Sequence, residues 1–172
     1  SEQYMEVKSS LDEFITIGDD FYKKAQRSIK EGDIETAIKG LEYASENIPT
    51  NFDINYLLGK LYVEKNDYAA AKNCLLQAFC IDSKSIDILQ KLSTVMLNTN
   101  DISGAYCCFK RMLPLVLNHQ KEYLEITKTI KELEKRFITD NTEERENFAK
   151  QYYSDNKYHL ALFEYENCVI LK

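Results

Sequence analysis

The chain has 172 residues, of which 44% are hydrophobic and 29% charged, and its formal net charge at pH 7 is -6. Its two prolines and five glycines are too few for a disordered chain or for a β fold with many turns. The acidic balance disfavours a general binder of nucleic acid or of anionic membranes, because neutralising phosphates requires clustered Lys and Arg. The length favours a single domain.

The first predicted element begins at a capping box, in which Ser10 and Glu13 are placed to satisfy free amides at a helix start. Residues 1–9 have no clear period, and we expect them to fray. The helix is predicted to carry Phe14, Phe21 and Ala25 inward. Gly18 should weaken it and separate a leading helix, 10–17, from the helix that follows.

One pattern then recurs every 34 residues, at 32–44, 66–78 and 100–112. Each copy begins with a residue that tolerates the left-handed conformation ending a helix: Gly32, Asn66 and Asn100. Each copy also has an alanine where two helices are expected to cross: Ala37, Ala71 and Ala105. The buried stripe continues at helical spacing through Leu41, Leu75 and Phe109, and then through Ala44, Ala78 and Met112.

A period of 34 with these residues resembles the tetratricopeptide repeat. The helix before the second copy also has Leu58, Gly59 and Tyr62 at the family's Leu-Gly-x-x-Tyr positions, whereas the corresponding helices of the other two repeats lack the tyrosine. The resemblance implies an all-α fold, a right-handed α-solenoid of helix-turn-helix repeats. Its first three repeats would span 18–51, 52–85 and 86–118 as part of one domain covering 1–172.

After Pro114 the repeat loses its phase, and the next turn-plus-alanine signature, Asn156 to Ala161, comes 22 residues late. That excess predicts an extra helix at 119–140 and a degenerate fourth repeat at 141–172, giving about nine helices in all. The extra helix has an apolar stripe made of Tyr123, Ile126, Ile130, Leu133 and Phe137. The stripe is too short to favour a coiled coil, so we expect it to pack on the solenoid, with self-association as the alternative.

The sequence has no constellation typical of an enzyme. His119 and His159 lie far apart without ligand spacing, and there is no phosphate-binding glycine loop or nucleophile elbow. The five cysteines include no Cys-x-x-Cys pair, which favours buried thiols in a reducing cytosol over a metal or redox site. We therefore expect no catalytic residue, cofactor or metal. Without a signal peptide or a long apolar run, the chain is predicted to be cytoplasmic.

By the resemblance, the first helices of the repeats line a concave groove in which peptides bind. The candidate groove residues recur in register: Asp19, Tyr22 and Gln26; Asp53, Tyr56 and Lys60; Asp87, Gln90 and Thr94. The aspartates form either an acidic ladder facing a ligand or a set of helix-start carboxylates, which the helix dipole favours. The tyrosines are equally consistent with a binding surface and with core packing.

Domains of this family that hold a chaperone's carboxyl-terminal tail use a clamp of Lys, Asn and Arg. The matching places here are Tyr22, Gln26, Leu57, Asp87 and Lys91, and only the last is basic. The resemblance therefore argues against such a clamp.

The function that these observations favour is a protein–protein interaction scaffold, or adaptor, without enzymatic activity. Its groove would prefer a segment with spaced Lys or Arg and some apolar residues. Because the chain starts and stops abruptly, the alternative is an accessory substrate-recognition domain of a larger enzyme, such as a glycosyltransferase. Neither hypothesis involves nucleic acid or insertion into a membrane.

Overall fold

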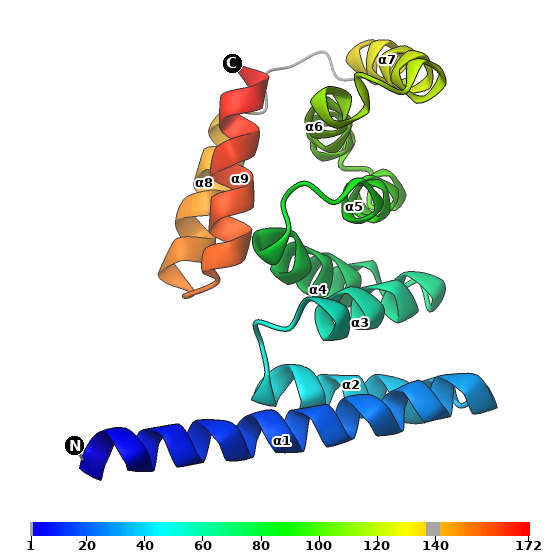
Figure 1. The fold of residues 1–172 in the computed structure, drawn as a ribbon. Helices are drawn as coiled ribbons and strands as arrows, with labels where there is room; N and C mark the ends of the chain where they lie inside the picture. Colours follow the sequence, from blue (N-terminus) through cyan, green and yellow to red (C-terminus); the bar gives the residue numbers. More distant parts are fainter. Residues whose placement is uncertain (1, 137–141) are drawn as a thin grey trace.

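The structure, a computed structural model, describes residues 2–136 and 142–172, and within these ranges it consists of helices joined by short turns (Figure 1). The helices are α1 (Glu2–Glu31), α2 (Ile34–Asn47), α3 (Phe52–Glu64), α4 (Tyr68–Ile81), α5 (Ile86–Asn98), α6 (Ile102–Met112), the 3₁₀ helix η1 (Leu113–Val116), α7 (Gln120–Glu134), α8 (Thr142–Ser154) and α9 (Tyr158–Leu171).

The helices pack as successive hairpins. The contacts within the pairs α1–α2, α3–α4, α5–α6 and α8–α9 are the most extensive, and α7 packs on α6 and η1. The pairs follow one another in a curved row from α1 to α7 (Figure 1). The prediction of an all-α helical solenoid is confirmed.

Left-handed residues end the first helix of each hairpin at the predicted places. The backbone φ is +81° at Gly32, +60° at Asn66, +58° at Asn100 and +59° at Asn156. In the first three hairpins an aspartate follows and accepts a hydrogen bond from the third residue after it, for example Asp67 from the amide of Ala70. Each turn thus ends one helix and caps the next.

The small residues predicted at helix crossings are buried. Ala37, Ala71 and Ala105 are completely buried. At Gly59 an added Cβ would lie 2.7 Å from Leu75 Cγ, so α3 approaches α4 more closely than any other residue would permit. The three alanines predicted at the crossings are therefore in the core, and the close approach of two helices is seen at Gly59.

The amino-terminal helix differs from the prediction. α1 is continuous from Glu2 to Glu31, so residues 2–9 do not fray and 10–17 is not a separate helix. The proposed cap lies inside α1, where the Ser10 hydroxyl donates to Glu6 O. Gly18 is needed for packing, because an added Cβ would lie 2.4 Å from Ile48 Cγ1 of the chain after α2. A glycine read as a helix breaker is instead a contact point between α1 and the end of its partner helix.

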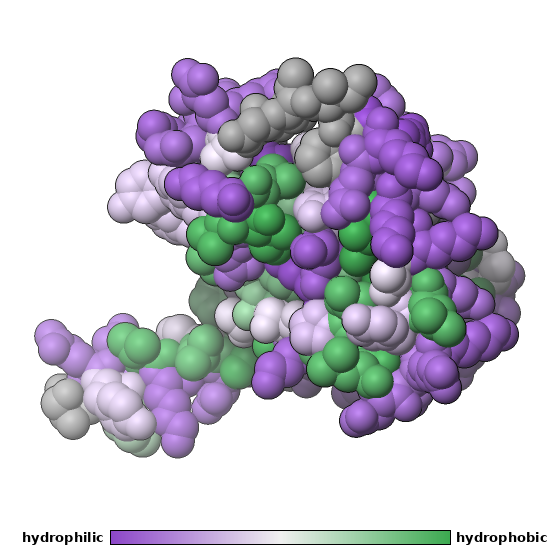
Figure 2. Space-filling view, turned by 90° about the horizontal axis from the view of Figure 1, so that it is seen from above, coloured by the Kyte–Doolittle hydropathy of each residue, from purple (hydrophilic) through white to green (hydrophobic). Residues whose placement is uncertain are grey.

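Only the second half of α1 packs on the rest of the molecule. Ala25 is buried and Phe21 half-buried, as predicted, but Phe14 is 52% exposed. The helix passes beyond the end of α2, and its first half projects from the body as an arm (Figures 1 and 2). We call residues 3–17 the α1 arm.

The extra helix packs as expected. Ile130 and Leu133 of α7 are buried in the core, and Tyr123 and Ile126 are half-buried. These side chains are used within the fold, which leaves little of the predicted stripe for self-association. Phe137 and the remainder of the predicted helix lie outside the described residues.

The last hairpin does not extend the row beyond α7. The α8–α9 pair turns back, and α9 lies across α4 and α6, the second helices of their hairpins (Figure 1). Phe163 of α9 is buried there and meets Phe79 of α4 edge to face, with 5.8 Å between ring centroids.

None of the helices in the described ranges combines the length and apolar content needed to cross a bilayer.

Candidate functional site

The nine candidate groove residues lie on the first helices of the first three hairpins. Asp19, Tyr22 and Gln26 belong to α1; Asp53, Tyr56 and Lys60 to α3; Asp87, Gln90 and Thr94 to α5. All nine are exposed or half-buried. We call this set the first-helix face.

A tyrosine–aspartate pair joins the second and third hairpins on this face. The Tyr56 hydroxyl donates a hydrogen bond to Asp87 Oδ2. Phe52 stacks on the Tyr56 ring at 5.8 Å, and Lys60 Nζ lies 5.8 Å from its centroid. Burial, the hydrogen bond and the charge of Asp87 together raise the pKa of Tyr56 to about 12. The ring is therefore held in place with its hydroxyl protonated.

A similar relation links the first and second hairpins. Burial and the nearby charge of Asp53 raise the pKa of Tyr22, while a hydrogen bond with Gln26 lowers it. In both cases the tyrosine of one hairpin lies beside the aspartate of the next. The repeated Tyr and Asp therefore help to hold adjacent first helices in register, a relation that single-sequence spacing did not reveal.

The three aspartates have different settings. Asp53 and Asp87 lie in the first turns of α3 and α5, where the helix dipole favours them. Asp19 lies in the middle of α1, so the helix-start interpretation does not hold for Asp19. Helix-start stabilisation therefore accounts for two of the three positions and leaves Asp19 without that role.

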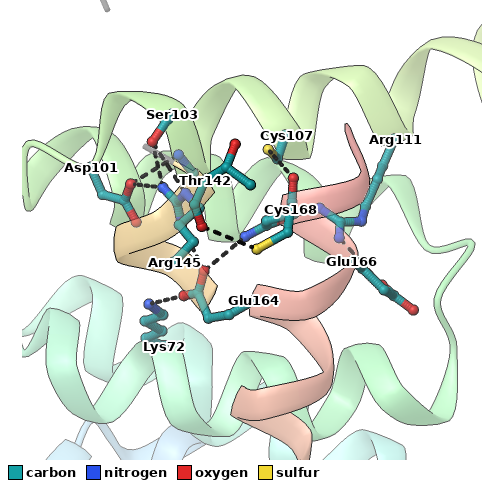
Figure 3. A network of polar contacts seen from close by, with 12 residues as sticks. Lys72, Asp101, Ser103, Cys107, Arg111, Thr142, Arg145, Glu164, Glu166 and Cys168 are labelled. Carbon is teal, nitrogen blue, oxygen red and sulfur yellow. Dashed lines mark hydrogen bonds and ion pairs between the residues drawn. The ribbon is translucent and has the colours of Figure 1, made fainter. Parts of the chain in front are cut away.

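The other side of the curved row, formed by α4 and α6, is covered by the α8–α9 pair through a polar network that the sequence analysis missed (Figure 3). Arg145 of α8 is 5% exposed and donates to three acceptors. They are Asp101 Oδ1 at the start of α6, Ser103 Oγ (3.2 Å from Nε) and Glu164 Oε2 of α9 (2.6 Å from Nη1). Lys72 Nζ of α4 lies 3.2 Å from Glu164 Oε1. Arg145 thereby links α8 to α6 and α9, and the Lys72–Glu164 ion pair adds α4 to the network.

The charges in this network favour one another. Burial alone would raise the pKa of Glu164, but Lys72, Arg145 and a hydrogen bond from Asn167 outweigh it and hold that pKa below its ordinary value. Burial likewise opposes the charge of Arg145, and Asp101 and Glu164 outweigh it. Both groups therefore remain ionised at neutral pH. The sequence around Arg145 did not indicate that this arginine would be buried in an ion-pair network, because its partners lie 19 to 44 residues away along the chain.

The comparisons with known proteins agree with this architecture. Residues 28–78 match the tetratricopeptide repeat family. The structure of MamA (AMB-1) shares 19% identity over 90% of this chain and 72% of its own, with a TM-score of 0.58. The Arabidopsis OM64 tetratricopeptide-repeat domain shares 15% identity over 72% of this chain and 99% of its own, with a TM-score of 0.57.

Residues 28–78 therefore match the tetratricopeptide repeat, and the chain shares the fold of tetratricopeptide-repeat domains. Another similar structure is the first repeat domain of Spaghetti (RPAP3) bound to the HSP90 peptide SRMEEVD. It shares 14% identity over 73% of this chain and 98% of its own, with a TM-score of 0.54. At these identities the likeness concerns the fold alone. The comparison with curated proteins gave no match.

The histidines and cysteines of this repeat protein do not form a reactive cluster. His119 is exposed before α7, whereas His159 is half-buried with Nε2 2.6 Å from Asn73 Oδ1. Cys74, Cys107, Cys108 and Cys168 are buried, as predicted, but Cys80 is exposed. Burial raises the pKa of Cys74, Cys107 and Cys108 to about 12, which keeps these thiols protonated. In the described ranges, no group of three or more His, Cys, Asp or Glu side chains is arranged to hold a metal ion.

Proposed function

We propose that the chain is a non-enzymatic scaffold that binds a segment of another protein on the first-helix face. The observation that carries this proposal is that the last hairpin covers one side of the repeat row and leaves the candidate residues on the first helices accessible to solvent. The α8–α9 pair packs on α4 and α6, whereas α1, α3 and α5 keep the nine recurring candidates accessible. Accessible rows of aromatic and charged side chains on a rigid helical support suit the recognition of a peptide.

The chemistry of this face favours a segment with both basic and apolar residues. The half-buried rings of Tyr22 and Tyr56 offer flat apolar surfaces at low entropic cost. Asp19, Asp53 and Asp87 provide negative charge along the same side, against one lysine, Lys60, among the nine candidates. Spaced Lys or Arg would pair with these carboxylates, and an acidic segment would be repelled.

The test compares two peptides of equal length and equal apolar content, one with spaced lysines and one with glutamates in their places. The basic peptide is expected to bind, and more weakly as salt rises. Changing Asp19, Asp53 and Asp87 together to Asn should weaken its binding by about tenfold, because three exposed charge pairs are removed. The measurement is affinity by calorimetry, with amide NMR shifts of α3 and α5 to locate the peptide.

A control variant removes the same amount of charge elsewhere. Glu143→Gln, Glu144→Gln and Asp155→Asn neutralise three exposed carboxylates of α8 and the turn after it. This variant should bind the basic peptide almost as well as the parent does. Equal weakening in both triple variants would mean that net charge alone attracts the peptide, and the proposed surface would be wrong.

A further inference from the structure

The α1 arm carries an apolar stripe that nothing in the described part of the chain covers. Its members are Tyr4, Val7, Leu11 and Phe14, each more than half exposed, and Ile15 beside them is 40% exposed. The spacing of three, four and three residues puts the first four on one side of the helix. Figure 2 shows the arm standing clear of the body with apolar residues on its surface.

The stripe continues an interface that already exists in the fold. The same alternation of three and four residues leads from Phe14 to Gly18, Phe21 and Ala25, and these three pack against α2 and the residue after it. That interface stops where the chain turns after α2, since Ile48 lies against Gly18. Beyond that point α1 keeps its apolar side but has no partner. A helix lying over Tyr4 to Phe14 would continue the course of α2.

The charges beside the stripe indicate which kind of helix fits. The arm, residues 3–17, contains three acidic side chains, Glu6, Asp12 and Glu13, and one basic side chain, Lys8. Lys8 lies nearest to the stripe, whereas Asp12 lies farther round the helix on the same side and Glu6 and Glu13 on the opposite side, each about 120–140° from the middle of the stripe. A second copy of the chain would bring two such acidic sets together, and an anionic membrane would be repelled. A helix with basic residues at its edges would pair with the carboxylates on both sides.

We propose that the α1 arm is a docking site for a basic amphipathic helix of another protein. The occupant extends the α1–α2 packing: its apolar stripe covers Val7 and Leu11, and its flanking Lys or Arg face the arm's carboxylates. The covered stretch from Tyr4 to Phe14 is about 16 Å long, so three turns of helix suffice. This surface is separate from the first-helix face, and each can be tested without the other.

The chain contains no tryptophan, which permits a single fluorescent reporter, Phe14→Trp. The probe is a synthetic peptide of about 14 residues with leucines at alternating three- and four-residue spacing and lysines at both edges. Binding is expected to shift the Trp emission to shorter wavelength as the ring leaves water, in a saturable manner. The same peptide with glutamates in place of lysines should cause no shift. The control reporter, Leu124→Trp, on an exposed position of α7, should not respond to either peptide.

A second variant tests the contact itself. Leu11→Glu in the Phe14→Trp chain should weaken binding by about tenfold or more, because burial of a leucine is lost. Leu124→Glu should leave it unchanged. Both variants should melt like the parent, since neither side chain packs in the core.

Four results would overturn the proposal. They are equal responses of the two reporters, equal binding of the lysine and glutamate peptides, a dimer in sedimentation equilibrium that Leu11→Glu dissociates, and a shift with lipid vesicles but not with the peptide. The dimer would show that a second copy covers the stripe, and the vesicle result that a membrane does.

Discussion

At the scale of single residues, the fold depends on side chains small enough to let helices touch. Ala71 of α4 is completely buried, and Gly59 of α3 leaves no room for a methyl group beside Leu75. Interiors packed at this density cannot absorb an extra isopropyl group, the difference between Ala and Leu, without moving a helix. Because each repeat contacts its neighbours, such a shift would spread along the row.

Replacing Ala71 by Leu should therefore be among the most destabilising single changes in the chain. Overpacking of this kind costs about 1–3 kcal/mol, which for a domain of this size lowers the melting temperature by several degrees. The matched control is Ala69→Leu, two residues earlier on the exposed side of the same helix. Calorimetry of both variants checks the prediction, and equal melting temperatures would mean that Ala71 does not lie at a tight crossing.

Features determined within one hairpin could be predicted from the sequence, whereas side-chain contacts between different hairpins could not. The left-handed Asn66 and the buried Ala71 followed from spacing, because each obeys a local steric rule. Arg145 gave no such signal, since its acceptors Asp101 and Ser103 lie more than 40 residues away. The same applies to the link between Tyr56 and Asp87 on the first-helix face.

At the scale of elements, the position of the α8–α9 pair depends on the buried Arg145. Asp101 and Glu164 both form ion pairs with Arg145. If this side chain were removed, both carboxylates would lose that pair, and Glu164 would keep only its ion pair with Lys72. An excess of 22 residues predicted an additional helix, but it contained no information on where the last hairpin would turn. That direction is set by Phe163 and the ion pairs together, a combination of apolar burial and charge.

Arg145→Met should destabilise the chain by about 3–5 kcal/mol, because it strands buried charge while keeping most of the side-chain volume. Changing Glu164 to Gln in the same chain should restore part of the loss, since one stranded carboxylate becomes neutral. Lys150→Met, which breaks an exposed ion pair with Glu146, is the control and should cost little. Urea unfolding measures all three. If Arg145→Met and Lys150→Met lose equal stability, the network does not hold the pair.

At the scale of the whole molecule, the two sides of the repeat row differ in what they contact. The side formed by α4 and α6 is occupied by the chain's own last hairpin, held by the Lys72–Glu164–Arg145–Asp101 chain of charges (Figure 3). The side formed by α1, α3 and α5 remains available. Since the charges join helices from three hairpins, the protonation of Glu164 affects more than its own helix.

The stability of the molecule should therefore fall in acid partly through Glu164. Its pKa in the folded chain is held below the ordinary value, chiefly because Lys72 and Arg145 outweigh burial. At neutral pH the carboxylate is ionised in both states, and its pairing stabilises the fold in full. As the pH falls through the ordinary glutamate value of about 4.3 and towards the lower folded value, the unfolded chain takes up the proton first, so stability is lost.

Glu164→Gln has no proton to gain at this position, so it should be less stable than the parent at pH 7 but lose less stability between about pH 5 and pH 3. Urea unfolding at a series of pH values would show the two stability curves converging as the solution becomes acidic. Glu144→Gln, an exposed residue on α8, is the control and should give a curve parallel to that of the parent. Parallel curves for Glu164→Gln and the parent would mean that the ion pairs around Glu164 contribute nothing to the docking of the last hairpin.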